Sequence, residues 1–323
     1  MTMRVLVTGG GGFIGSHIAA HLLESGYRVR VLDNFATGRR ENLLVLGGEV
    51  ELIEGDIQSY ERVSKAVAGC EIVLHQAALP SVPRSVQDPL TSNATNVIGT
   101  LNVLLAARDH DVRRVVCASS SSVYGANTDQ SKREDGLTLP ISPYATAKLA
   151  AEGYARSMHG VYGLDTVALR YFNVFGPRQD PTSQYAAVVP NFITAMLAGR
   201  PPVIFGDGEQ SRDFTYVANV VHANMLAIDA AGAAGRVYNV ACGQRVTLNR
   251  LVAALRELLG SGIEAVYSAP RVADVRHSLA DLSRARAELG YEPSVQLRDG
   301  LQRTIDHLRD ESVPRDAALA GAV

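Results

Sequence analysis

Short apolar runs alternate with longer amphipathic stretches along the first half of the chain. The runs are rich in β-branched residues and predict strands, and the stretches between them repeat apolar positions at helical spacing. The predicted strands are residues 4–8, 28–32, 50–53, 71–75, 114–118 and 166–170, and the predicted helices are 13–24, 59–68, 89–107 and 143–162. This alternation predicts a parallel, doubly wound sheet with helices on both faces. A ligand is expected at the carboxyl ends of the strands.

After about residue 170 the pattern becomes irregular and richer in Gly and Pro. Residues 237–240 still have a strand-like pattern and are expected to return to the sheet. We therefore predict an α/β protein in which a smaller α/β domain is interleaved with the doubly wound one. The first domain covers residues 1–170 with returning segments near 215–245, the second covers 171–311, and residues 312–323 form a flexible tail.

Composition narrows the class of protein. The chain has 323 residues, 46% of them apolar, and 31 Lys and Arg against 33 Asp and Glu, for a formal net charge of −2. The length fits about two domains, at roughly 100–200 residues per domain. The apolar fraction excludes a fibrous or disordered chain, and the charge argues against a nucleic acid or an anionic membrane as the main partner. A bound anion must therefore be held by a local site.

The cysteine residues and the absence of long apolar runs indicate in which cell compartment the protein is expected. Cys70, Cys117 and Cys242 each lie in an apolar stretch, and an odd number cannot all pair, which fits buried thiols in a reducing compartment. No 18 consecutive residues are apolar, and the N-terminal residues lack a leader pattern. We expect a cytoplasmic protein that contacts no membrane, and we assign no metal site.

A glycine-rich segment follows the first predicted strand and opens the first helix. In Thr8-Gly-Gly-Gly-Gly-Phe-Ile-Gly15, glycines 9, 12 and 15 let the backbone turn tightly and let a pyrophosphate approach amide N–H groups. Alone, the motif also fits a turn without a ligand. Asp33 ends the second strand 18 residues after Gly15, near the roughly 20-residue spacing at which an acid meets the adenosine ribose hydroxyls. The acid disfavours a 2′-phosphate and predicts NAD, although Arg39 and Arg40 follow in the loop.

Two further strand ends carry polar residues. Asp56 follows the third strand and lies either near the adenine edge or in an ordinary polar turn. His75-Gln-Ala-Ala78 ends the fourth strand with small residues, as a backbone passing under a ribose requires. His75 itself is interpreted as a buried, hydrogen-bonded histidine rather than a base.

Tyr144 and Lys148 lie one turn apart on the predicted helix 143–162 and so share a face. A nearby ammonium lowers a tyrosine pKa from about 10 towards neutrality and makes the phenol a usable general base. The spacing is common, and a solvated helix face is the alternative. However, Ser119-Ser-Ser-Ser-Val-Tyr-Gly125 follows the fifth strand, at the same sheet edge as the glycine loop. This placement favours a catalytic site over a flexible serine linker.

With these elements in order, the sequence resembles the extended short-chain dehydrogenase/reductase superfamily, and within it the NAD-dependent UDP-sugar 4-epimerases. The resemblance runs from residue 7 to about residue 293 and includes residues 32–38, 96–100, 169–177 and 206–214. It implies a Rossmann-type first domain that binds NAD⁺ and a second domain that binds a UDP-hexose. It also implies a homodimer that pairs the helices around 89–107 and 143–162.

The resemblance also implies roles for individual residues. Tyr144 is the catalytic acid and base, Lys148 tunes it and holds the nicotinamide ribose, and Ser120 hydrogen-bonds the sugar O4. The NAD contacts, besides Tyr144 and Lys148, are Gly9, Gly12, Phe13, Ile14, Asp33, Asn34, Thr37, Gly38, Asp56, Ile57, Gln76, Ala77, Ala78, Asn96 and Tyr171. The substrate contacts are Ser81, Ser120, Ser121, Ser122, Asn173, Arg178, Gln179, Val188, Val203, Phe205, Arg212, Arg271, Asp274 and Ser278. From spacing alone, Arg212 and Arg271 are surface arginines.

Ser121 and Ser122 separate this sequence from sister families. Sugar-nucleotide 4,6-dehydratases carry an Asp-Glu pair at these positions, and UDP-glucuronate decarboxylases carry a Glu. Dehydration needs an acid and a base, and serines supply neither. We therefore expect oxidation at C4 to a transient 4-keto sugar and return of the same hydride. The alternatives are a dehydratase or reductase of the same class, and a non-catalytic nucleotide-sugar sensor.

The identity of the hexose stays open at this stage. Ser278 falls beside the sugar C2 in the family pattern, and its small side chain leaves room for an N-acetyl group as well as for glucose. Arg178 fits either a cation that pairs with the C6 carboxylate of UDP-glucuronate or an exposed loop residue.

Overall fold

Seven parallel strands form the central sheet of the molecule. The fold is taken from a computed structural model that describes residues 2–46, 50–180, 187–270 and 275–312. The strand order is β11-β6-β5-β4-β1-β2-β3, and neighbouring strands are parallel throughout. The strands are β1 (Arg4–Thr8), β2 (Arg28–Asp33), β3 (Glu51–Glu54), β4 (Ile72–His75), β5 (Arg114–Ser120), β6 (Thr166–Tyr171) and β11 (Arg236–Val240). The predicted Rossmann-type α/β fold is confirmed.

The topology reverses direction between β1 and β4. From β1 the chain moves outward to β2 and β3, and it then returns to the other side of β1 to build β4, β5 and β6. Loops after β1 and β4 leave the sheet in opposite directions, so the carboxyl ends of these two strands form the switch point where such sheets bind ligands. The six strands predicted from the sequence are all present, with ends that differ by at most two residues.

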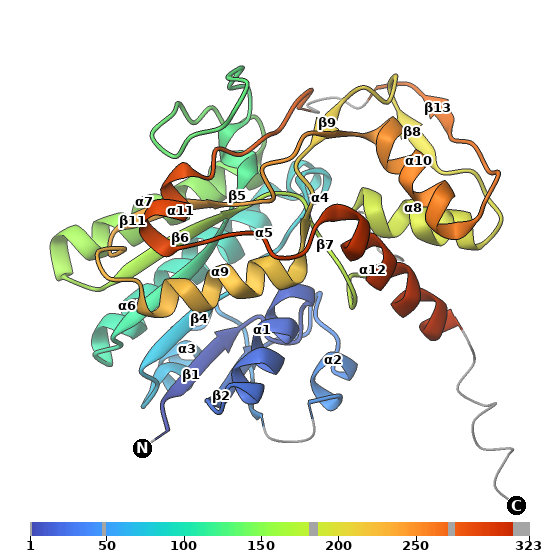
Figure 1. Ribbon diagram of the computed structural model, residues 1–323. Helices are drawn as coiled ribbons and strands as arrows, with labels where there is room; N and C mark the ends of the chain where they lie inside the picture. The colour runs from blue at the N-terminus through green and yellow to red at the C-terminus, as the bar shows by residue number, and fades with distance from the viewer. Residues whose placement is uncertain (1, 47–49, 181–186, 271–274, 313–323) are drawn as a thin grey trace, which may run out of the picture.

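Helices cover both faces of the sheet, because strand residues alternate between them. Val5 and Val7 of β1 pack with α1 (Phe13–Glu24), α9 (Val217–Asp229) and α11 (Ser283–Leu289). Leu6, between them, packs on the opposite face with α3 (Tyr60–Val67), α6 (Thr100–Asp109) and α7 (Pro143–Tyr162). Figure 1 shows α1 and α9 together on one side of the sheet.

Helix α7, which carries Tyr144 and Lys148, has well-defined ends. Ser142 caps its first turn by accepting the N–H of Ala145 at 3.2 Å, and Pro143 occupies the first helical position. Gly163 ends the helix in the left-handed conformation at φ 71°. The start of α7 is therefore fixed against the serine segment that follows β5.

The predicted helix over residues 89–107 is not continuous. It consists of α5 (Pro89–Asn93), a π-helical segment η1 (Ala94–Gly99) and α6. In η1 the Asn96 amide brackets the backbone of Leu79, donating to its O at 3.0 Å and accepting its N–H at 2.8 Å. Apolar periodicity predicts helix but does not distinguish a π turn, which in other proteins often marks a functional site.

The remaining elements gather at one side of the sheet around a third apolar cluster. Phe192 and Ile193 of α8, Leu251 of α10 and Leu301 of α12 belong to this cluster. In Figure 1 these three helices lie to the right of the sheet. The helices are α8 (Val188–Leu197), α10 (Leu248–Leu259) and α12 (Leu297–Ser312), and the strands are β7 (Val174–Phe175), β8 (Val203–Phe205), β9 (Ser211–Arg212), β10 (Thr215–Tyr216), β12 (Val246–Thr247) and β13 (Val266–Ser268). The short strands pair two by two, as β10-β7, β12-β9 and β13-β8.

Three smaller segments complete the description. Helices α2 (Glu41–Leu44) and α4 (Val82–Gln87) and the 3₁₀ turn η2 (Ser121–Tyr124) lie in connections that follow strands. Ser119 and Ser120, predicted to lie in the loop after the fifth strand, are the last residues of β5. Ser312, predicted to begin a flexible tail, ends α12, and the rest of that predicted tail lies outside the described residues.

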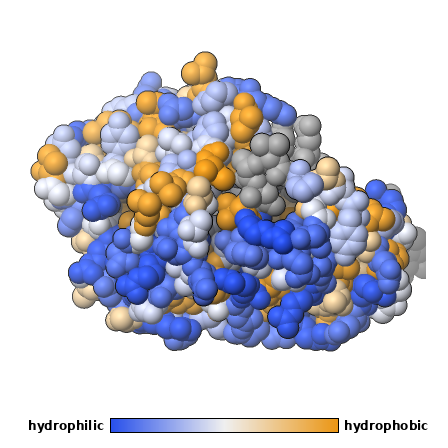
Figure 2. Space-filling view, turned by 90° about the horizontal axis from the view of Figure 1, so that it is seen from above, coloured by the Kyte–Doolittle hydropathy of each residue, from blue (hydrophilic) through white to orange (hydrophobic). Residues whose placement is uncertain are grey.

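Hydrophobic and hydrophilic residues are interspersed on the face seen from above, with hydrophobic residues gathered near its middle (Figure 2). Within the described ranges, no helix combines the length and apolar character needed to cross a membrane. Cys70, Cys117 and Cys242 are buried free thiols.

Candidate active site

The glycine loop, residues 9–15, lies at the switch point, and its backbone packs directly against the backbone of neighbouring segments. A Cβ on Gly9, which has φ 71°, would lie 2.7 Å from the Cα and N of Ala77, and one on Gly15 would lie 2.1 Å from the carbonyl oxygen of Gly9. The N–H of Gly9 donates to the carbonyl of Leu32 at 2.8 Å. Only glycine fits these positions. Gly12, Phe13 and Ile14 continue this turn into α1, as a cradle for a pyrophosphate requires.

Asp33 holds the end of β2 against this loop. Its carboxylate accepts the N–H of Gly11 at 2.8 Å and that of Phe35 at 2.7 Å. It is 7% exposed, and burial raises its pKa although these hydrogen bonds oppose the rise. Both neighbouring arginines are paired: Arg39 with Asp180 at 2.7 Å, and Arg40 with Glu54 at 2.5 Å.

The loops after β2 and β3 are joined to each other. Asn34 donates from Nδ2 to Asp56 Oδ2 at 2.8 Å, and Asp56 also accepts the N–H of Gln58 at 2.8 Å. Gly38 lies against the Asp33 carboxylate, and Thr37 is exposed. Asp56 is therefore part of a polar turn that lies beside the Asp33 loop, and Ile57 next to it is buried.

His75, at the end of β4, is a buried histidine with both nitrogens engaged. Nδ1 lies 2.7 Å from Thr8 Oγ1, and Nε2 lies 2.9 Å from Thr100 Oγ1. Burial, with a smaller contribution from the Lys148 charge, lowers the His75 pKa to about 3, so the ring is neutral near pH 7. The interpretation of His75 as a structural residue is confirmed.

The residues after His75 meet the end of β6. Tyr171 donates from its hydroxyl to Gln76 Oε1 at 3.1 Å, and Asn224 of α9 donates to that hydroxyl at 2.8 Å and accepts from Gln76 Nε2 at 3.2 Å. These three hydrogen-bonded side chains lie at the carboxyl edge of the sheet, next to Ala77 and Ala78 in the chain. Burial raises the pKa of Tyr171, which keeps its proton.

Tyr144 and Ser120 meet where α7 begins and β5 ends. Their side chains lie close enough for Ser120 to lower the pKa of the Tyr144 phenol. The N–H of Tyr144 donates to Ser85 Oγ of α4 at 3.0 Å, and Ser120 Oγ accepts the N–H of Ser122 at 3.2 Å. A phenol and a hydroxyl in contact at the carboxyl edge of the sheet can pass a proton to or from a bound alcohol.

The charge state of Tyr144 differs from the sequence expectation. Burial raises its pKa to about 12, and the hydrogen bond from Ser120 only partly offsets this effect. Lys148 was expected to lower the Tyr144 pKa, but its ammonium donates to the Ala118 carbonyl at 3.0 Å, and burial lowers the Lys148 pKa to about 8. Burial therefore dominates the pKa of both groups.

Two of the expected substrate residues have a buried polar atom without a protein partner in the described part of the chain. Ser122 Oγ and Gln179 Oε1 are both buried without a hydrogen bond, although Gln179 Nε2 donates to the Val174 carbonyl at 3.2 Å. Ser81 has φ 101°, a conformation that is strained for a residue with a side chain, and caps α4 by accepting the N–H of Arg84. Unpaired buried hydroxyls and stored strain both indicate a ligand site.

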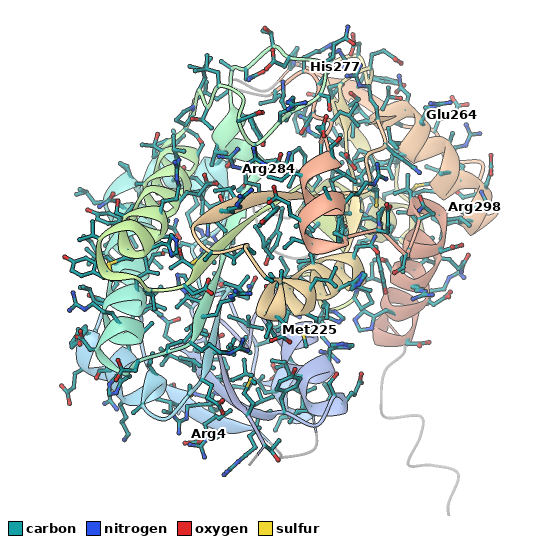
Figure 3. The ribbon with its side chains drawn as sticks, turned by 60° about the vertical axis from the view of Figure 1, so that its left-hand side comes forward. Arg4, Met225, Glu264, His277, Arg284 and Arg298 are labelled. Atoms are coloured by element: carbon teal, nitrogen blue, oxygen red, sulfur yellow. The ribbon has the colours of Figure 1, made fainter. Side chains whose placement is uncertain are left out.

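A second polar group gathers on the short strands. The N–H of Ser278 donates to the Ser211 carbonyl at 3.1 Å, His277 Nδ1 lies 2.9 Å from Ser211 Oγ, and Arg212 donates to the same carbonyl at 2.9 Å. In Figure 3, His277 lies at the opposite end of the molecule from Arg4, the first residue of β1. The proposed site residues Arg212 and Ser278 therefore come together through Ser211, whereas Arg271 and Asp274 lie outside the described residues.

The other expected substrate residues are distributed around this group. Asn173, at φ 36°, donates to the carbonyl of Asp213 at 3.1 Å. Val188 begins α8, and Val203 and Phe205 lie at the two ends of β8.

Arg178 points to a different part of the molecule. Its guanidinium donates to the Ser16 carbonyl of α1 at 3.2 Å, and its N–H donates to His307 Nε2 of α12 at 3.1 Å. His17 Nε2 lies 3.0 Å from the neighbouring Pro177 carbonyl. Arg178 is therefore part of a junction between α1, α12 and the loop after β7, and it is not a simple exposed loop cation.

Four polar residues near the site were missed by sequence reasoning. Glu152 follows Lys148 by one helical turn, so continuing the four-residue spacing from Tyr144 would have found it. Arg170, Asn224 and Asn239 carry no local signal, because their partners come from distant elements. Among the described residues, no group of three or more His, Cys, Asp and Glu side chains is arranged to hold a metal ion.

Comparison with known proteins identifies similar chains. Residues 5–241 match the family model described as NAD dependent epimerase/dehydratase. The UDP-glucose 4-epimerase of Mycolicibacterium smegmatis is 40% identical over 314 residues, which cover 96% of this chain and 100% of that protein. The UDP-N-acetylglucosamine 4-epimerase of Methanobrevibacter ruminantium, solved with UDP-N-acetylmuramic acid, superposes with a TM-score of 0.92 at 41% identity and covers 96% and 100% of the two chains. The UDP-glucose 4-epimerase of Thermus thermophilus in complex with NAD has a TM-score of 0.87 at 38% identity, covering 95% and 99%.

Proposed function

Because the chain belongs to the NAD dependent epimerase/dehydratase family, we propose that it is an NAD⁺-dependent enzyme that inverts C4 of a UDP-hexose. The observation that carries this proposal is the contact of Tyr144 with Ser120 at the same sheet edge as the glycine cradle. A proton-transferring pair beside a dinucleotide site is suited to oxidising and then reducing one alcohol.

The residues at the switch point fit NAD⁺. Gly9 and Gly15 leave space that a Cβ would fill, and Asp33 at the end of β2 suits the two hydroxyls of an unphosphorylated ribose. Arg39 and Arg40 are both paired with carboxylates, which disfavours a role in binding a 2′-phosphate. When bound, NAD⁺ supplies the hydride acceptor and donor for C4. We propose that NAD⁺ is held by the loops that follow β1, β2, β3 and β4. Asn96, Lys148 and Tyr171 would contact it as well.

Tyr144 would move the O4 proton. As a phenolate it would take the proton of the C4 hydroxyl, and as a phenol it would return a proton to O4 once the hydride has been returned to the opposite face of C4, with Ser120 hydrogen-bonded to both oxygens. Its pKa of about 12 without ligands means that the phenol starts protonated near pH 7. In a weakly screened pocket, positive charge brought close to the phenol lowers that pKa strongly.

The substrate would be held at its nucleotide end and left free at its hexose end. We propose that Arg212 and Asn173, with Arg271 and Asp274, bind the diphosphate and the uridine ribose, and that Val188, Val203 and Phe205 border the uracil. Besides Tyr144, Ser120 and Ser278, the hydroxyls of Ser81, Ser121 and Ser122 and the amide of Gln179 would face the sugar. This asymmetry suits a 4-keto sugar that must turn over between two hydride transfers. We propose that the UDP site lies in residues 171–311 and the NAD site in residues 1–170 with 215–245.

The structure favours a neutral hexose. The Arg178 guanidinium donates to the Ser16 carbonyl and is thereby directed to α1. We propose UDP-glucose and UDP-N-acetylglucosamine as substrates, with Ser278 leaving room at C2, and not UDP-glucuronate. If Arg178→Ala abolishes activity on the uronate alone, the neutral assignment is wrong.

The test is to incubate the purified protein with each UDP-hexose without added NAD⁺ and to analyse the sugar. Epimer should form without net production of NADH or loss of water, because the hydride returns to the same sugar. Tyr144→Phe should lower kcat by about 10²–10⁴-fold while UDP-sugar binding, measured by calorimetry, persists. A 4,6-dehydratase would release a 4-keto-6-deoxy product, and a nucleotide-sugar sensor would bind without turnover.

We also propose that two copies associate through α5 and α7 in the cytoplasm. Leu90 is 82% exposed and Ile141 42%, and a hollow of about 570 Å³ is lined by Pro89 next to Leu90, by Ile141 and by the start of α7. Apolar side chains exposed in one area are typical of a protein interface. Light scattering on a size-exclusion column should give twice the 34.5 kDa chain mass, and Leu90→Asp should halve it.

A further inference from the structure

A buried polar chain anchors the end of β5 that precedes Ser120. Ser119 Oγ donates to Glu152 Oε1 of α7, and Arg170 of β6 donates to Glu152 through Nε at 2.9 Å and Nη2 at 2.7 Å. The three residues are 5%, 4% and 4% exposed. The end of β5 therefore contacts α7 at two places. Ser120 lies beside Tyr144, and the preceding residue, Ser119, is hydrogen-bonded to Glu152.

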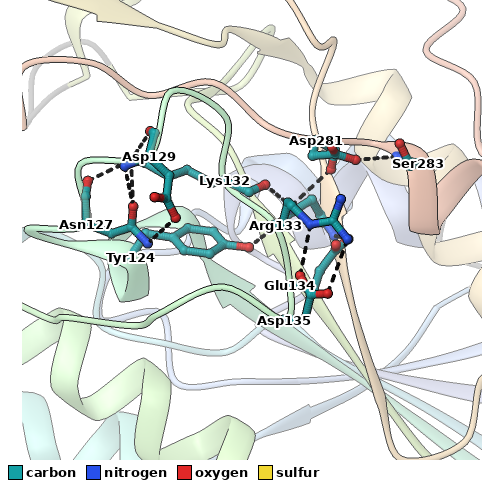
Figure 4. A network of polar contacts seen from close by, with 10 residues as sticks. Tyr124, Asn127, Asp129, Lys132, Arg133, Glu134, Asp135, Asp281 and Ser283 are labelled. Carbon is teal, nitrogen blue, oxygen red and sulfur yellow. Dashed lines mark hydrogen bonds and ion pairs between the residues drawn. The ribbon is translucent and has the colours of Figure 1, made fainter.

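The other end of the serine turn is anchored by the same network. The Arg170 guanidinium lies 4.8 Å from the ring centre of Tyr124, whose hydroxyl donates to Asn239 Oδ1 at 2.7 Å. Asn239 is fully buried and donates to the carbonyls of Lys132 at 2.8 Å and Asp281 at 3.1 Å. Figure 4 shows this junction between the loop after the serine turn and the segment that follows Ser278.

The ion pair between Glu152 and Arg170 is not expected to stabilise the fold by itself. Removing two charges from water is costly, and Arg170 Nη1 is buried without a hydrogen-bond partner in the described structure. Apolar side chains would fill the space at lower cost. Because the pair contacts Ser119 and Tyr124, we infer that its role is to fix the position of the serine turn.

We propose that Glu152 is a positioning residue for the reaction: held by Arg170, it fixes Ser119 and so sets the position of Ser120 beside Tyr144. The inference rests on the proposed function and assigns this role to a residue that does not touch the substrate. Ser119 transmits the position, and Tyr124 and Asn239 hold the far end of the turn.

Glu152 has a second effect through charge. Lys148 and Glu152 lie four residues apart on α7 and so share one face of that helix, and His75 of β4 and Cys117 of β5 also interact electrostatically with Lys148. Between pH 6 and 8, His75 is neutral with a pKa of about 3 and Cys117 keeps its proton with a pKa of about 12, so neither of these two groups carries a charge beside Lys148. Burial lowers the Lys148 pKa to about 8, and Glu152 opposes this shift.

Ser119→Ala tests positioning most directly, because it leaves the Glu152 and Arg170 pair intact. We expect kcat to fall about fivefold, from the loss of about one hydrogen bond, with an unchanged KM for the UDP-sugar and unchanged NAD content. Backbone amides of residues 120–125 should exchange with deuterium about fivefold faster. Ser119→Thr, which keeps the hydroxyl, should restore both values.

Thr166→Val is the matched control. Thr166 Oγ1 donates to the Ala155 carbonyl at 2.8 Å, so this variant also removes a buried hydrogen bond to α7, but at the opposite end of the strands. It should lower the melting temperature without changing kcat or the exchange of residues 120–125. If it changes kcat as much as Ser119→Ala does, the effect is one of general stability and the inference is wrong.

Glu152→Gln tests the effect of charge. We expect the alkaline limb of the kcat profile to move to lower pH, because Lys148 then loses its proton more readily, whereas Ser119→Ala should leave that limb in place. An unmoved limb in folded Glu152→Gln overturns the charge effect. If the parent protein does not epimerise any UDP-hexose, the proposed function fails, but the exchange measurement still decides whether Ser119 holds the turn.

Discussion

The glycine loop and the Ser211 region both face bound nucleotide in the proposed enzyme, but they are built differently. At the glycine loop, backbone packs on backbone, as where a Cβ on Gly15 would lie 2.1 Å from the Gly9 carbonyl. Around Ser211, the strands β9 and β12 are two residues long, and the side chains of Arg212 and His277, which are more exposed, contact the buried Ser211. Backbone packing allows one geometry, whereas side chains on short strands adjust to what they bind.

This difference matches the proposed reaction. A cofactor that is reduced and reoxidised in each turnover benefits from a rigid site from which it does not leave. A sugar that must present both faces needs a site that holds the nucleotide and tolerates movement of the hexose. The three predictions below test whether the two regions differ as described.

The largest effect is expected from Gly15→Ala. The added methyl group overlaps the Gly9 carbonyl, so the loop must shift, and we expect a loss of about 3 kcal/mol in the free energy of unfolding together with loss of bound NAD. Urea unfolding and chromatography of the nucleotide released on denaturation measure the two. Gly153→Ala, where nothing lies within 4 Å of the added Cβ in α7, should instead be neutral or stabilise by up to about 1 kcal/mol. Equal NAD content in the two variants would contradict a rigid cradle.

Arg212→Ala should raise the KM for the UDP-sugar about tenfold, because one charged hydrogen bond to the diphosphate is lost at a partly exposed position. The value of kcat, the NAD content and the melting temperature should stay at the level of the parent protein. Arg276→Ala in the neighbouring segment is the control: its guanidinium pairs with Asp207 at 2.8 Å and both side chains are 56% exposed, so this variant should leave the KM for the UDP-sugar unchanged. A fall in kcat for Arg212→Ala would place it in the chemistry and not in binding.

The two regions should respond to pH in opposite directions. In the first, His75 has a folded pKa of about 3 against an ordinary value of 6.5, so the unfolded chain binds an extra proton between these values and stability falls as pH falls. In the second, Asp213 accepts N–H groups of Cys242, Gly243 and Ala280, yet burial raises its pKa to about 6, so stability falls as pH rises from 4 to 6.

Urea unfolding between pH 4 and 6.5 measures these slopes. His75→Gln should reduce the rise of the unfolding free energy with pH by about 1.4 kcal/mol per pH unit, and Asp213→Asn should increase it by about the same amount. Changes of the same sign in both variants would show that the assigned protonation states are wrong.

The local parts of the fold and site were predictable. The alternation of apolar runs predicted the six strands, and the glycine spacing with Asp33 predicted the switch-point loop, because each signal lies within a few residues of the chain. The π segment in η1 was not predictable, since it has the same apolar periodicity as an α-helix. The pKa of Tyr144 was also misjudged, because spacing shows that Lys148 is close but not that its ammonium is bonded to Ala118.

By itself, the sequence determined the doubly wound sheet, the cofactor class and the pairing of Tyr144 with Lys148 on one helix face, because these follow from periodicity and short spacing. Only the tertiary structure decided that Arg178 is directed to α1, that Ser278 meets Arg212 through Ser211, and that Glu152 joins Ser119 to Arg170. Such contacts connect residues 18 to 162 positions apart in the chain. They depend on how whole elements pack, and no local pattern of residue types records that packing.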